Sequence, residues 1–271
     1  MSPASQSLPS RFSPTRIALN RAARRLFWPH PALYFPFGIF RKRGNVLKSN
    51  FDLYISGYPR SGNTFARTAF LSANPNVRVQ SHRHIPSFDL RLVHRKIPGI
   101  VLLRTPLDAA ISWAIHENQP IEEAIAYWND FYRVLMPVRS QLFVATFEDV
   151  TTDFGAVMRA FNATWRTSYT PFDHSPENTA RCFELTEEEH RGPWGDIREL
   201  RVCRPSEQRR AVKEAHLREL AQSKFLQDEL LIANDLYQTF LHFRAKGDRQ
   251  TSTRLVPEKQ ARPTVGVGAP V

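Results

Sequence analysis

The amino-acid sequence predicts one α/β domain with a central parallel β-sheet flanked by helices. Short apolar runs alternate with segments of helical periodicity from residue 51 onward, as in parallel strands joined by crossover helices. A hydrophobic content of 42% with 23% charged residues is typical of a globular protein, and 271 residues suffice for one large α/β domain.

The first predicted strand covers residues 52–57 and closes with Gly-Tyr-Pro, and a helix is expected over 61–71. The second apolar run, residues 99–104, precedes Pro106 in a helix-starting position and a helix to about residue 116. The same patterns predict a helix over 121–138, a strand over 141–147, and helices over 154–162 and 206–243.

The domain is expected to span residues 51–243, between two basic terminal segments. Residues 1–50 hold nine Lys/Arg and no acid, and residues 244–271 hold six Lys/Arg against two acids. The body is therefore nearly neutral, and a nucleic-acid partner is not expected. The C-terminal segment, 244–271, is rich in Thr, Pro, Gly and Val and is predicted to be disordered.

The basic N-terminal arm, residues 1–50, is predicted to contain a helix over residues 16–28. Pro29, Pro31 and Pro36 are expected to break any further helix and to leave the neighbouring aromatic residues outside the core. Two interpretations of the arm stay open: a strap packed on the domain, or peripheral membrane contact through residues 11–48.

Cysteine usage and hydropathy bear on the compartment. Cys182 and Cys203 have neither metal-site nor redox spacing, so no disulfide framework and no structural zinc site is expected. No apolar run reaches membrane-spanning length, and no signal-peptide stretch is visible near residue 1. We predict a cytoplasmic protein, with peripheral membrane association as an option; the sequence does not indicate an oligomeric state.

A glycine-containing loop follows the first predicted strand. Residues 57–64 read Gly-Tyr-Pro-Arg-Ser-Gly-Asn-Thr, which has the Walker A spacing G-x-x-x-x-G-K-S/T with Asn63 in place of lysine. Such a loop directs backbone N–H groups and a helix N-terminus toward a phosphate, and Arg60 can supply the missing cation. The sheet is therefore predicted to resemble that of P-loop nucleotide hydrolases. The alternative is ordinary turn chemistry between a strand and a helix.

A second anion site is predicted where the buried run of residues 100–103 ends in Arg104. Ser112 lies two helical turns beyond, so the two side chains could share a phosphate; the alternative is an ion pair between Arg104 and Asp108. A nucleoside triphosphatase normally has an acid that holds magnesium at the end of such a strand. Arginine at this position disfavours a metal-dependent kinase, and no metal is expected.

Together the two segments resemble the family of sulfotransferases that use 3′-phosphoadenosine 5′-phosphosulfate (PAPS), in particular the small bacterial type. The family loop reads like T-Y-P-K-S-G-T-T-W and its second segment like R-x-P-x-D-x-x-x-S. This chain has Gly57-Tyr-Pro-Arg-Ser-Gly-Asn-Thr-Phe65 and Arg104-Thr-Pro-Leu-Asp-Ala-Ala-Ile-Ser112 in the same order. The resemblance implies a sulfuryl transferase with PAPS as donor and adenosine 3′,5′-bisphosphate (PAP) as product.

The resemblance also implies roles for individual residues. Arg60 would stabilise the charge that develops on the phosphosulfate bridge, and Phe65 would replace the family tryptophan near adenine. The implied binding residues for the 5′-phosphate are Ser61, Gly62, Asn63 and Thr64, and those for the 3′-phosphate are Arg104 and Ser112. A weaker match to R-K-G-x-x-G-D-W adds Arg191 and Gly192 as further phosphate contacts.

The family places a catalytic histidine in a segment like K-T-H-x-P, and this chain reads Val-Gln-Ser-His-Arg-His-Ile-Pro over 79–86. We prefer His82 as the base because it follows a small hydroxyl residue, while His84 has the family distance to Pro86. Gln80 stands where the family has lysine. The acceptor, a hydroxyl or amine of a small molecule, glycan or lipid, is not specified by the sequence.

Two other functions stay open at this point. One is an ATP-dependent small-molecule kinase. The other is a non-catalytic adaptor that binds anions or a membrane surface through the basic arm.

Overall fold

A computed structural model describes residues 13–40, 51–189 and 207–244 of the chain. Its centre is a parallel sheet of four strands in the order β2-β1-β3-β4. The strands are β1 (Leu53–Gly57), β2 (Val79–Ser81), β3 (Gly99–Leu103) and β4 (Phe143–Thr146). In register, Ile55 of β1 lies opposite Ile100 of β3, and Val101 opposite Val144 of β4.

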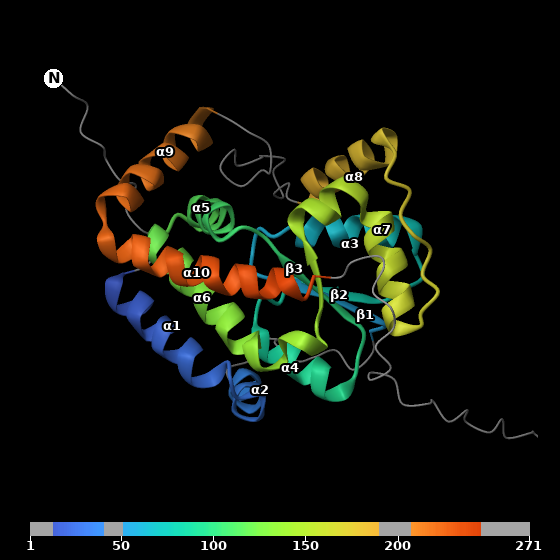
Figure 1. The fold of residues 1–271 in the computed structure, drawn as a ribbon, viewed down its shortest axis with the longest axis horizontal. Helices are drawn as coiled ribbons and strands as arrows, with labels where there is room; N and C mark the ends of the chain where they lie inside the picture. The colour runs from blue at the N-terminus through green and yellow to red at the C-terminus, as the bar shows by residue number, and fades with distance from the viewer. Residues whose placement is uncertain (1–12, 41–50, 190–206, 245–271) are drawn as a thin grey trace, which may run out of the picture.

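Helices cover both faces of this sheet (Figure 1). The side chains of alternate strand residues form two separate cores, one packed on α4, α6 and α10 and the other on α3 and α7. The helices are α1 (Pro14–Phe27), α2 (Pro31–Phe40), α3 (Asn63–Ala73), α4 (Pro86–Arg95), α5 (Pro106–Glu117), α6 (Ile121–Leu135), α7 (Phe147–Trp165), α8 (Pro176–Glu189), α9 (Glu207–Gln222) and α10 (Lys224–His242), with a 3-10 turn over Met136–Gln141. In the described ranges, no helix combines the length and apolarity needed to cross a bilayer.

The predicted α/β class, the three predicted strands and the helix that starts at Pro106 are confirmed. The short strand β2 and helices α4 and α8 were not among the predicted elements. Helix α7 begins at Phe147 rather than near residue 154, because Thr146 and Asp149 form a reciprocal capping box there, and a kink at Asp153 divides it. The predicted disordered tail lies outside the described residues from 245 onward.

The expectation that proline would end helical structure after residue 28 is wrong, because α2 continues through Pro36. The arm also contributes to the core, with Trp28, Tyr34 and Phe35 buried and the ring of Phe35 at 5.0 Å from that of Phe88. Burial of these rings outweighs the cost of one proline inside a helix.

Helix α1 packs on α6 through ion pairs rather than through apolar contacts alone. Arg24 and Arg21 contact Glu123, and Arg24 and Arg25 contact Asp130, with both acids nearly buried. The basic charge of α1 is therefore partly neutralised by the domain. The exposed large apolar residues on this side are Leu19, Leu26 and Leu33.

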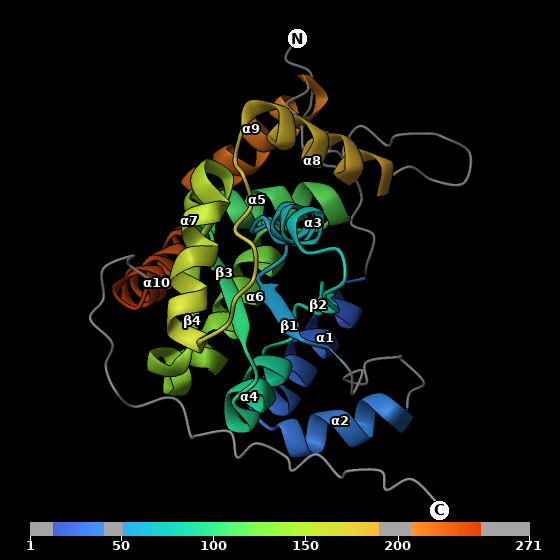
Figure 2. The same cartoon turned by 90° about the vertical axis from the view of Figure 1, so that its right-hand side faces the viewer.

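The order of the strands places a crevice between β1 and β3. The chain passes from β1 to β2 on one side and then crosses back to β3 on the other, so the connections diverge at the carboxyl ends of β1 and β3. Open parallel sheets bind ligands at this point. Figure 2 shows α8 and α9 lying beyond α3 and α5 at one end of the domain, with α2 and α4 at the other.

Candidate anion-binding site

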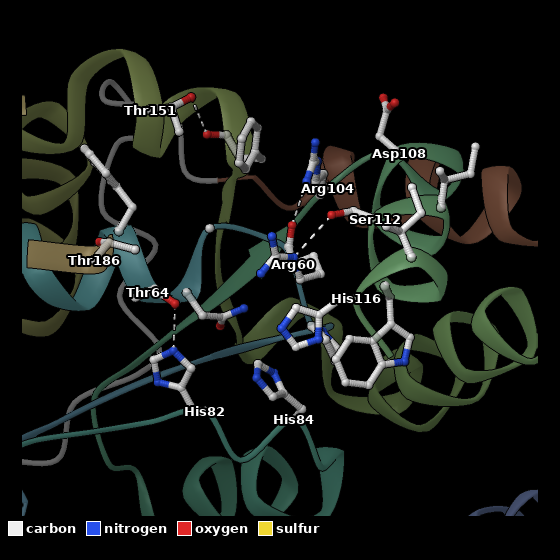
Figure 3. Close-up of a pocket in the computed structure, with 18 of the residues that line it drawn as sticks. Arg60, Thr64, His82, His84, Arg104, Asp108, Ser112, His116, Thr151 and Thr186 are labelled. Atoms are coloured by element: carbon white, nitrogen blue, oxygen red, sulfur yellow. Dashed lines mark hydrogen bonds between the residues drawn. The ribbon is translucent and has the colours of Figure 1, made fainter. Parts of the chain in front are cut away.

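A cavity of about 740 Å³ opens where the β1–α3 and β3–α5 connections meet. Its walls come from several parts of the chain: the β1–α3 loop and the first turn of α3, His82 and His84, Arg104 and α5, the start of α7, α8 and α9. Six of the predicted site residues that line this cavity are labelled in Figure 3: Arg60, Thr64, His82, His84, Arg104 and Ser112.

Two glycines shape the loop between β1 and α3. Gly57 has φ of +140°, and a Cβ there would lie 2.4 Å from the carbonyl oxygen of Leu102 on the neighbouring strand. Gly62 has φ of +90° and occupies the N-cap of α3, where it offers no side chain to the N–H groups of the first turn. The loop therefore crosses close over β3, and the N-terminus of α3 faces the cavity without a side-chain cap.

The interior of the loop is held by buried polar contacts. Asn63, in the position of the Walker lysine, donates from Nδ2 to the carbonyl of Tyr58 at 3.1 Å. The hydroxyl of Tyr58 in turn donates to the carbonyl of Ala124 on α6 at 2.9 Å. Ser61 is fully buried and is not among the residues that line the cavity, so its side chain does not face the site.

Arg60 and Arg104 bring two guanidinium groups to the same cavity. Arg60 has φ of 65° and donates from Nε to the hydroxyl of Ser112 at 3.2 Å. Arg104 donates from Nη1 to the carbonyl of Arg60 at 2.8 Å and lies 4.2 Å above the ring of Phe147. The sequence had offered Asp108 as an alternative partner of Arg104. In the structure, Oδ2 of Asp108 accepts a hydrogen bond from the hydroxyl of Thr105 at 2.8 Å, and Oδ1 lies 3.6 Å from Nζ of Lys213.

The two histidines differ in their surroundings. The ring of His82 is exposed, with Nδ1 at 2.7 Å from the hydroxyl of Ser81 and Nε2 at 3.0 Å from that of Thr64. The half-buried His84 donates from Nδ1 to the carbonyl of Gly57 at 2.8 Å. Because that carbonyl only accepts, Nε2 of neutral His84 carries the lone pair.

Burial lowers the pKa of His84 to about 4, and the positive charges of His82 and Arg60 add to this shift against the opposing effect of the Gly57 hydrogen bond. Tyr127 fixes the same segment by donating to the carbonyl of His84 at 2.8 Å. The positive φ of His82 and of His84, 60° and 47°, is consistent with a segment held in place by these contacts.

An aromatic wall closes the end of the cavity near α8. Phe65 lines the cavity with its ring centroid 5.3 Å from that of Phe183 and 5.8 Å from that of His174. Trp113 and His116 line another part, and their rings stack with centroids 5.6 Å apart and an interplanar angle of 13°.

Several lining residues were not predicted as site residues: Asp108, Phe147, Thr151, Phe183, Thr186, Arg210 and Lys213. Phe147 follows directly on the carboxyl end of β4, and this position is a sequence signal that could have indicated it. The residues of α8 and α9 carry no local signal, because only the packing of these helices brings them to the cavity. Arg191 and Gly192 lie outside the described residues, and Gln80 is buried.

A scan against protein-family models finds no match to this chain, and a search of curated proteins finds no significant relative. The likeness to sulfotransferases therefore rests on the two motifs and on what the residues in them can do.

Proposed function

We propose that the chain is a sulfotransferase that moves a sulfuryl group from PAPS to a hydroxyl or amine of its acceptor. One observation carries the proposal: Arg60 and Arg104 follow neighbouring parallel strands and line one cavity at the point where the connections diverge. A nucleotide with anionic groups on both sides of its ribose matches two cations on adjacent strand ends.

The residues of the cavity fit such a donor. A P-loop-like connection with Gly62 at the helix N-cap suits the 5′-phosphate, and Arg104 and Ser112, which line the same cavity, suit the 3′-phosphate. The rings of Phe65 and Phe183, which both line the cavity, offer an apolar wall for adenine. Arginine after β3, in place of a magnesium-binding acid, favours this donor over a metal-bound triphosphate.

The geometry favours His84 over His82 as the base, although the sequence had favoured His82. Pro86 is the first residue of α4. When it is aligned with the proline of the family pattern K-T-H-x-P, His84 takes the place of the histidine, and His82 rather than Gln80 takes the place of the lysine. His84 also has its tautomer set by Gly57, whereas Nε2 of His82 is engaged with Thr64 of the loop. We therefore assign proton transfer to His84 and contact with the donor to His82.

The reaction is a transfer between two oxygen atoms or from oxygen to nitrogen. The acceptor atom forms a bond to sulfur while the bond from sulfur to the phosphate oxygen breaks, and the acceptor proton passes to Nε2 of His84. Negative charge develops on the departing phosphate oxygen, and Arg60 is positioned to stabilise it.

The first test is nucleotide binding by the full chain in EDTA. PAP should raise the melting temperature in the absence of divalent metal, by an amount that grows with its concentration. Transfer of labelled sulfate from PAPS to a panel of acceptors then tests the activity itself. Stabilisation by ATP with magnesium and not by PAP would refute the proposal in favour of a kinase.

A further inference from the structure

Helix α9 contributes two cations to the cavity that no motif indicated. Arg210 and Lys213 both line it, and they are three residues apart, which places them on one face of α9. Among the described residues, the cavity is thus lined by four Arg and Lys side chains, including Arg60 and Arg104, and by one carboxylate, that of Asp108.

The contacts of Lys213 locate this pair within the cavity. Its Nζ lies 3.6 Å from Oδ1 of Asp108, which is one helical turn before Ser112 on α5. Asp108 also accepts from Thr105, the residue directly after Arg104. Figure 3 shows Arg104, Ser112 and Asp108 together on one side of Arg60, with His82 and His84 on the other.

We infer that Arg210 and Lys213 bind the second phosphate of the nucleotide, the 3′-phosphate, together with Arg104 and Ser112. This inference rests on the proposed function. A phosphate monoester carries close to two negative charges at neutral pH and has three acceptor oxygens, which one guanidinium and one hydroxyl do not satisfy. Within the described part of the chain, the α9 pair supplies further donors and offsets the charge of Asp108.

The experiment compares PAP with adenosine 5′-phosphate, which lacks only the 3′-phosphate. Binding of both is measured by calorimetry in EDTA for the wild type and for the double variant Arg210→Gln with Lys213→Gln. We expect the double variant to lose about tenfold or more in affinity for PAP, the size of one or two charge-assisted hydrogen bonds, and to change less than about twofold for adenosine 5′-phosphate.

Two matched variants sharpen the comparison. Arg218→Gln removes an exposed cation of the same helix that does not line the cavity, and it should leave both affinities unchanged. Asp108→Asn removes the opposing carboxylate and should strengthen PAP binding.

The possible failures can be told apart. Suppose that the wild type binds PAP, and that the double variant either loses the same affinity for PAP and for adenosine 5′-phosphate or loses affinity for neither. The inference is then overturned and the proposed function stands. If the variant instead raises only the KM of the acceptor, the α9 cations belong to the acceptor site and the inference is again overturned. If the wild type does not bind PAP, the proposed function fails and this inference fails with it.

Discussion

Arg104 donates a hydrogen bond to the backbone carbonyl of Arg60 at 2.8 Å, so the cation after β3 holds the loop after β1. Arg60 has a left-handed backbone, and this contact is one of the interactions that hold it there. The two arginines are therefore structurally coupled. Substitution of Arg60 and of Arg104 should affect different steps, turnover and nucleotide binding, but the effects of the two substitutions should not be fully independent.

Replacement of Arg60 should act mainly on turnover. We expect Arg60→Ala to lower kcat for sulfuryl transfer by about a hundredfold or more, since it removes a donor to the developing charge. Arg60→Lys introduces the lysine of the family loop and should recover part of that loss.

Replacement of Arg104 should act mainly on nucleotide binding. Arg104→Ala should raise the Kd of PAP by about tenfold or more with a smaller effect on kcat. Wild-type turnover in both alanine variants would contradict these roles.

The pH profile tests the assignment of the base. Because the pKa of His84 is lowered to about 4, the ring is neutral through the physiological range. The acid limb of kcat/KM should therefore fall near pH 4 and not near 6.5, the ordinary value for histidine. His84→Gln should lower kcat by about a hundredfold while PAP binding is retained. A limb near pH 6.5 that disappears in His82→Gln would assign the base to His82 instead.

Asp89 should make stability fall as the pH rises. Burial raises its pKa to about 7 despite the hydrogen bond from Ser56, so the folded state favours the protonated acid. Between pH 3.8 and about 7 the folded state holds the proton more tightly than the unfolded chain, and the stabilisation is lost as the pH rises through this range. We expect Asp89→Asn to raise the melting temperature relative to wild type more at pH 8 than at pH 5. An equal shift at both pH values would contradict this linkage.

Arg24 should be important for attaching α1 to the domain. Its guanidinium contacts both Glu123 and Asp130, and Arg24→Gln leaves these nearly buried acids with fewer partners. We expect a loss of about 2 kcal/mol in the free energy of unfolding, measured by urea denaturation. Arg181→Gln breaks an exposed pair with Glu184 and should cost less than about 1 kcal/mol. Equal effects of the two variants would show that the α1 ion pairs are not needed for stability.

Gly57 and Gly99 lie on neighbouring strands and form a matched pair for substitution. A Cβ at Gly57 would meet the carbonyl of Leu102 at 2.4 Å, whereas one at Gly99 would meet the nearest atom at an ordinary 3.4 Å. Gly57→Ala should therefore destabilise the fold by about 2 to 4 kcal/mol, and Gly99→Ala by less than about 1 kcal/mol. Thermal unfolding of the two variants measures the difference; similar melting temperatures would contradict the predicted clash.

Local patterns were sufficient to predict the strand before the glycine-containing loop and the helix that follows β3. The run that ends at Gly57 and the helix that starts at Pro106 follow from apolar periodicity and from proline and glycine preferences, which act over a few residues. The helix α2 was missed because its stability comes from the contact of Phe35 with Phe88, more than fifty residues away.

The sequence alone determined which residue types follow each strand, and hence that Arg60 and Arg104 would lie at strand ends. The tertiary structure decided that β1 and β3 are neighbours, that Ser61 turns into the interior, and that α9 brings Arg210 and Lys213 to the same cavity. The physical reason is that strand order and helix docking depend on burial of apolar surface between distant segments, and no short stretch of sequence encodes it.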